Sequence, residues 1–127
     1  MKTMVVVAAA ALALAGCQKP KPAGDLNSEL ESQILAWRTG IVKTDKACAT
    51  KAEACTNFDV GCKGAQAITP AEAAKGVTAK VVVAMSWNAF DPKDGDADPV
   101  SRTRRFEKTD GVWTGQDVAP VNLSTCS

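Results

Sequence analysis

Residues 77–90 read VTAKVVVAMSWNAF, and this stretch decides how the chain folds. Every second residue from Val77 to Trp87 is apolar, whereas polar residues such as Thr78 and Lys80 occupy positions between them. Side chains of a β-strand point alternately to the two faces of a sheet. The alternation therefore predicts one long strand that is half buried, with an apolar face against the core and a wetter face opposite.

A β-hairpin is predicted downstream, in residues 101–118 (SRTRRFEKTDGVWTGQDV). Asp110-Gly111 is a strong two-residue turn signal, and it lies between two alternating segments. Directly opposite residues of a hairpin lie on the same face, as do residues two apart in one strand. Phe106 and Trp113 should therefore share a face. The predicted register pairs Thr109 with Val112, Lys108 with Trp113, Phe106 with Gly115 and Arg104 with Asp117.

An amphipathic helix is predicted in residues 25–47 (DLNSELESQILAWRTGIVKTDKA). Ser28 and Glu31 fit a capping box at its start. Gly40 weakens the helix by about 1 kcal/mol relative to alanine without ending it. The same helical face, continued, leads to Cys48 and Cys55. Its apolar residues are Leu26, Leu30, Ile34, Trp37 and Ile41.

A short second helix is predicted in residues 68–76 (ITPAEAAKG). Thr69 is its N-cap, Pro70 takes the first helical position, Glu72 completes a capping box and Gly76 ends it. These elements together predict an α+β fold. An N-terminal amphipathic helix packs on a small antiparallel sheet of three to four strands.

The N-terminal residues 1–17, MKTMVVVAAAALALAGC, begin with the basic Lys2 and continue with an apolar run. This run has about 12 residues, whereas a membrane-spanning helix needs about 20. The pattern predicts a signal peptide. Its last four residues, LAGC, resemble the lipobox of bacterial lipoproteins.

The lipoprotein resemblance implies cleavage before Cys17, whose sulfur carries a diacylglyceryl group and whose new N-terminus is acylated. Two or more acyl chains anchor a protein stably to a bilayer. Gln18 stands where many inner-membrane lipoproteins have aspartate, so we expect the outer membrane, with the domain in the periplasm or at the cell surface. The chain divides into a signal peptide (1–16), a lipid anchor and tether (17–24) and a single α+β domain (25–127).

Four cysteines remain beside the anchor, and in an exported domain they predict two disulfides. The spacing has no C-x2-C pair and the chain has no histidine, so a zinc site is not indicated. Three connectivities are open. If residues 48–55 were helical, the Cα atoms of Cys48 and Cys55 would lie about 10.5 Å apart, too far for a bridge. Asn57 and Asp59 then suggest a chain reversal before Cys62, and Cys126 fixes the C-terminus.

The helix-first order and the closing KTDGVW hairpin (108–113) are similar to cystatin-like and NTF2-like small domains. This resemblance concerns about the last forty residues. It implies an α+β fold and says nothing about function, because such folds carry many activities.

Two groups of residues are candidate sites. Asp94, Asp96 and Asp98 resemble the first three ligands of a calcium loop. However, Pro99 stands where that pattern has glycine and Arg105 where it has glutamate, which favours a solvated turn. Arg102, Arg104 and Arg105 form a basic strand that is a possible partner-binding surface.

The sequence disfavours several functions. The absence of histidine removes the usual base of a hydrolytic triad, so we expect no enzyme and no cofactor. The chain has 15 Lys+Arg and 14 Asp+Glu, and loss of Lys2 with the signal peptide balances these charges, which argues against nucleic-acid binding.

Two functional hypotheses remain. In the first, the protein is a non-catalytic envelope lipoprotein that acts as a protein-interaction module. It binds an envelope partner, either as an accessory subunit or as an inhibitor or immunity-type protein. In the second, it is a passive structural or small-ligand-binding lipoprotein. A closed pocket lined by Met85, Trp87 and Trp113 would favour the second hypothesis.

Overall fold

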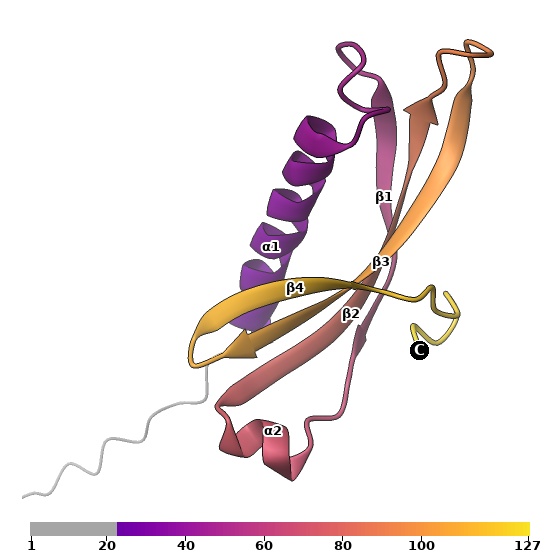
Figure 1. Ribbon diagram of the computed structural model, residues 1–127. Helices are drawn as coiled ribbons and strands as arrows, with labels where there is room; N and C mark the ends of the chain where they lie inside the picture. Colours follow the sequence, from indigo (N-terminus) through magenta and orange to yellow (C-terminus); the bar gives the residue numbers. More distant parts are fainter. Residues whose placement is uncertain (1–22) are drawn as a thin grey trace, which may run out of the picture.

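The computed structural model describes residues 23–127. Its order is α1 (Ala23–Thr44), β1 (Cys55–Ala65), α2 (Pro70–Ala74), β2 (Val77–Phe90), β3 (Ala97–Thr109) and β4 (Val112–Val118). The strands form a four-stranded antiparallel sheet in the order β1-β2-β3-β4, and α1 lies across one face of it (Figure 1). The predicted α+β class is therefore confirmed. No helix in residues 23–127 is long and apolar enough to cross a membrane.

Strand β2 coincides with the stretch from Val77 to Phe90 that the alternation predicts. It is paired along both edges, with β1 and β3. The apolar stripe of α1 packs on its inward face, and Trp37 of α1 contacts the ring of Phe106 edge to face. The core cluster consists of Leu30, Ile34, Trp37, Ile41, Cys48, Val81, Val83, Met85, Trp87, Ala89 and Phe106.

The start of α1 differs from the prediction. The helix begins at Ala23, so Ser28 lies inside the helix and not at its N-cap. Leu26 is 39% exposed although its spacing places it on the apolar stripe, whereas Leu30 is only 5% exposed. The stripe is therefore buried from Leu30 onward.

The hairpin and the short helix form as predicted. Thr109 pairs with Val112 and Arg104 with Asp117, as the Asp110-Gly111 turn requires. At α2, the Thr69 hydroxyl accepts from the Glu72 N–H while the Glu72 carboxylate accepts from the Thr69 N–H. Glu72 also accepts a hydrogen bond from Lys80 of β2, and this bond lowers the pKa of the Glu72 carboxyl.

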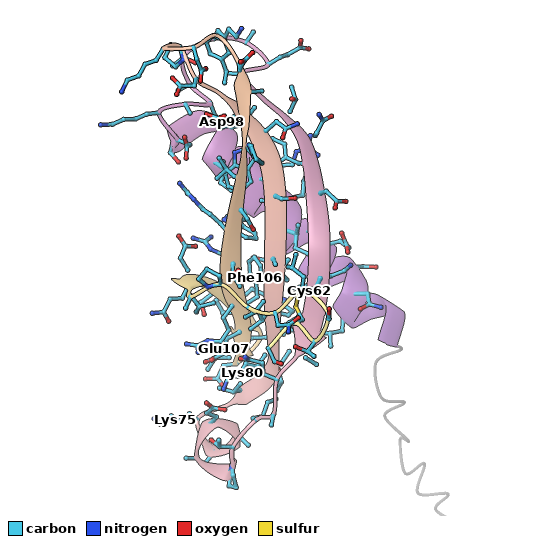
Figure 2. The ribbon with its side chains drawn as sticks, turned by 90° about the vertical axis from the view of Figure 1, so that its right-hand side faces the viewer. Cys62, Lys75, Lys80, Asp98, Phe106 and Glu107 are labelled. Carbon is cyan, nitrogen blue, oxygen red and sulfur yellow. A yellow bond between two sulfur atoms is a disulfide. The ribbon has the colours of Figure 1, made fainter. Side chains whose placement is uncertain are left out.

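The outer face of β2 is not wet at its centre, which corrects the half-buried prediction. Val82 and Ala84 point away from α1, yet each is only 2% exposed. Residues 119–127, which we call the C-terminal strap, cross this face of the sheet (Figure 2), where Cys126 contacts Val82 and is joined to Cys62, the β1 partner of Ala84. The Cys62–Cys126 disulfide holds the strap on the sheet, with the Cys126 sulfur 3.5 Å from the Val82 carbonyl oxygen.

The second disulfide joins Cys48 to Cys55, with a Cα–Cα distance of 5.0 Å. The helical continuation that would separate these cysteines is absent, because α1 ends at Thr44. The Asp45 carboxylate accepts the N–H of Ala47, and this local bond competes with continuation of the helix. The two predicted disulfides are thus present, and the helical argument against joining Cys48 to Cys55 is wrong.

The chain reversal expected before Cys62 is also wrong, because residues 55–65 form strand β1. The turn-forming residues create irregularities in the strand instead. The pairing with β2 shifts between Thr56 and Asp59 and again between Val60 and Cys62, and Asn57 has a positive φ of 57°. A bulge accommodates an extra residue of this kind without ending the strand.

Replacing Gly64 of β1 by alanine should displace the strap. A Cβ atom at Gly64 would lie 2.8 Å from the Cβ of Cys126 and 3.1 Å from its carbonyl oxygen, closer than packed atoms allow. We expect Gly64→Ala to lower the free energy of unfolding by about 1–3 kcal/mol, the usual cost of overpacking. Urea denaturation of the oxidised protein measures this change.

Gly61→Ala is the matched control, because its Cβ would lie 3.6 Å from the Leu123 side chain, an ordinary contact distance. A loss of stability in Gly61→Ala as large as that in Gly64→Ala would contradict the proposed close contact.

Candidate functional site

A hollow of about 260 Å³ opens between α1 and the β3–β4 part of the sheet. β4 ends at Val118, which pairs with Thr103, so the β3 residues before Thr103 have no β4 partner. We call this hollow the arginine groove. From α1 it is lined by Gln33, Ala36, Trp37, Gly40, Ile41 and Thr44, and from the sheet by Arg102, Arg104, Phe106, Gly115 and Asp117.

Arg104 lies across the floor of the groove. Its Nε donates to Asp117 at 2.9 Å, and its guanidinium lies 5.4 Å from the centre of the Trp37 ring. Gly115 makes this position possible, because a Cβ there would lie 3.0 Å from Cδ of Arg104 and 3.3 Å from the ring of Phe106. A cation over the face of tryptophan is attracted by the ring.

Arg102 lies on the same face, two residues along the strand. It donates to Asp45 at 2.8 Å, and its guanidinium lies 5.7 Å from the Trp87 ring. Arg105 points to the opposite face, where it donates to Gln116 at 3.2 Å. The structure therefore brings two of the three predicted arginines together and separates the third from them.

Gly40 leaves the opposite wall of the groove open. No described atom outside its own helical backbone and chain neighbours lies within 4 Å of the position that a Cβ would take. Packing therefore does not require glycine here, although glycine inside a helix costs about 1 kcal/mol relative to alanine. The sequence indicates this cost but does not connect Gly40 to Arg104.

Gly40→Ala should stabilise the protein, because alanine has the better helix propensity and its methyl group meets no other side chain. We expect the free energy of unfolding to rise by about 0.5–1 kcal/mol in urea denaturation. A decrease would indicate that the groove closes onto Gly40 in solution and would contradict the open geometry.

A second, smaller hollow of about 180 Å³ lies on the other flank of α1, beside β1. Leu35 at its rim is 60% exposed, and Arg38 lies 4.8 Å from the centre of the Phe58 ring. Met85 borders this hollow, whereas Trp113 bonds to Glu29 near the start of α1. Met85, Trp87 and Trp113 therefore do not line one closed pocket.

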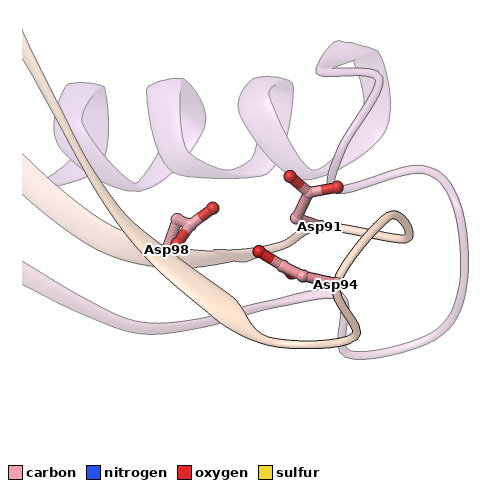
Figure 3. A group of neighbouring side chains, drawn as sticks. All are labelled: Asp91, Asp94 and Asp98. Carbon is pink, nitrogen blue, oxygen red and sulfur yellow. The ribbon is translucent and has the colours of Figure 1, made fainter.

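The loop between β2 and β3 contains the calcium candidates. The carboxylates of Asp91, Asp94 and Asp98 converge, with oxygen atoms within 4.8 Å of one another (Figure 3). Asp96 does not belong to this group and Asp91 takes its place, which corrects the predicted set. The carboxylates of Asp91 and Asp94 already accept backbone N–H groups, from Lys93 at 2.8 Å and from Asp96 at 3.0 Å.

We expect millimolar calcium to leave the melting temperature unchanged. Calcium takes six to eight oxygen ligands. This group offers carboxylates from three residues, and two of them, Asp94 and Asp98, are exposed. A ligand that binds the native state and not the unfolded chain raises the melting temperature, and the rise grows with the ratio of free ligand to its dissociation constant. A calcium-dependent rise that Asp94→Asn removes would contradict this expectation, and magnesium at equal concentration controls for ionic strength.

Cys17, the candidate lipidation residue, lies outside the residues that the structure describes. The chain matches no protein-family model, no curated protein and no solved structure.

Proposed function

We propose that this protein is a non-catalytic lipoprotein of the outer membrane that binds another envelope protein through the arginine groove. Cys17 anchors it in the bilayer, and the domain is a protein-interaction module, as an accessory subunit or an inhibitor or immunity-type protein. The observation that carries the proposal is the groove itself. It is an open hollow in which two arginines of β3 lie opposite the unfilled space at Gly40 of α1, with Trp37 next to Gly40 on the same helix.

The groove favours a partner segment that carries a carboxylate. Arginine has five N–H donors. Arg102 and Arg104 each donate one hydrogen bond to another side chain here. Asp117, which pairs with Arg104, has a side chain that is 57% exposed. A partner carboxylate can therefore exchange with Asp117 at modest desolvation cost. Arginine is also enriched among the residues that dominate binding energy at interfaces.

The other functional classes have less support. The chain has no histidine to act as a general base, and its four domain cysteines are in disulfides, so they supply no thiolate nucleophile. The small-ligand alternative required a closed pocket at Met85 and Trp87, but these residues are each 2% exposed and belong to the packed core. We propose no cofactor and no nucleic-acid partner.

Site-specific photo-crosslinking in the native envelope tests the proposal. A photoreactive residue at Thr44, which lines the groove, should give one adduct of defined mass. The same residue at Thr56, exposed on the opposite face of β1, should not give it. Arg104→Ala should reduce the Thr44 adduct at least tenfold, equivalent to about 1.4 kcal/mol of binding free energy.

Arg105→Ala is the matched control, because it removes a neighbouring arginine that points away from the groove. Equal adducts at Thr44 and Thr56, or equal losses in Arg104→Ala and Arg105→Ala, would sink the proposed site. Circular dichroism of each variant separates lost binding from lost folding.

A further inference from the structure

We propose that one end of the domain docks directly on the bilayer that holds the acyl chains of Cys17. This basal end consists of the start of α1, helix α2 and the β3–β4 turn, which all lie in the lower part of the molecule in Figure 1. The inference rests on the proposed function, because it requires Cys17 to be lipidated.

The length of the connection places this end next to the membrane. Residues 18–22 separate Cys17 from Ala23, the first residue of α1. This connection spans at most about 20 Å when fully extended, whereas the 22 residues of α1 alone are about 33 Å long. The start of α1 is thus held near the bilayer. A weak contact between the domain and the bilayer is then enough for docking, because the tether makes this contact intramolecular.

The basal end is one connected platform. Glu29 of α1 accepts hydrogen bonds from Lys108 Nζ at 2.6 Å and from Trp113 Nε1 at 3.1 Å, which fix the hairpin to the helix. The Asp110 N–H donates to the Gly76 carbonyl at 3.0 Å, which fixes the hairpin turn to the end of α2. Contact of any of the three elements with a surface therefore orients all three.

The platform exposes the residue types that suit a membrane interface. Val112 is 62% exposed and Leu26 is 39% exposed. Helix α2 contains no buried residue, and Lys75 directly after it is exposed at the bottom of the molecule (Figure 2). Trp113, next to Val112 in β4, is half-buried. The interface between lipid headgroups and acyl chains favours apolar side chains, lysine and the amphipathic ring of tryptophan.

Among the described residues, the one converging group of three carboxylates lies at the opposite end, whereas the basal end exposes Asp110 in the hairpin turn. The loop with Asp91, Asp94 and Asp98 lies at the far end of the molecule from Lys75, as the labels of Asp98 and Lys75 in Figure 2 show. Carboxylates are repelled by anionic lipids. Docking by the basal end therefore presents the second half of α1, and with it the arginine groove, away from the bilayer.

Depth-dependent quenching tests the orientation. The full-length lipidated protein is reconstituted in vesicles of phosphatidylcholine and phosphatidylglycerol that contain a nitroxide-labelled lipid. Because the domain cysteines are in disulfides, one added cysteine can carry a fluorophore, in Val112→Cys at the basal end or Asp94→Cys at the far end. We expect the label at position 112 to be quenched at least twofold more than the label at position 94.

A second variant tests the contact without changing the anchor. With the label in Ala74→Cys, Val112→Asp should reduce quenching, whereas Val42→Asp, an equal change at an exposed valine outside the basal end, should not. Equal quenching at positions 112 and 94, in protein that still floats with the vesicles, overturns the docking proposal and leaves the lipid anchor intact.

Failure of the anchor gives a different result. Cys17→Ser should remain in the supernatant when the vesicles float, and wild-type protein should float. Wild-type protein that stays in the supernatant overturns both the proposed anchor and the docking that rests on it.

Discussion

The burial of β2 on both faces is the constraint on which the rest of the structure depends. On one face, α1 covers Val83, Met85 and Trp87; on the other, the C-terminal strap covers Val82 and Ala84. The first cover is a long helix, whereas the second is a short segment without regular structure. The strap therefore needs the Cys62–Cys126 disulfide to hold it on the sheet. This bond restricts the whole loop between the two cysteines in the unfolded chain, and not only the C-terminus.

The sequence predicts those parts of the fold that local rules govern. The alternation in residues 77–90, the Asp110-Gly111 turn and the capping box at Thr69 each give correct bounds or register, because each depends on neighbouring residues. The Cys48–Cys55 pairing depends on where α1 ends, and the position of the strap depends on its packing over Val82. A local bond at Asp45 competes with continuation of the helix, and hydrophobic periodicity does not reveal it.

The candidate site could be predicted only in part for the same reason. The sequence identifies the arginines, and strand alternation already assigns Arg104 and Arg105 to opposite faces. It does not reveal that Arg104 meets Trp37 and faces Gly40, since that juxtaposition requires the packing of α1 against β3. A glycine inside an otherwise regular helix is the one local sequence signal of this open wall.

The same constraint limits where function can lie. Because α1 and the strap occupy both faces at the centre of the sheet, the surface left for a partner is at the flanks of α1, on the outer face of β3 and β4 around Arg105 and Gln116, and at the two ends of the domain. The flank beside β3 and β4 offers two arginines and an unfilled helix position, whereas the basal end offers scattered apolar side chains and a lysine. The former suits a partner of defined shape and charge, the latter a deformable lipid surface. With the proposed anchor at Cys17, the protein can use both surfaces at once, since α1 separates them along its length.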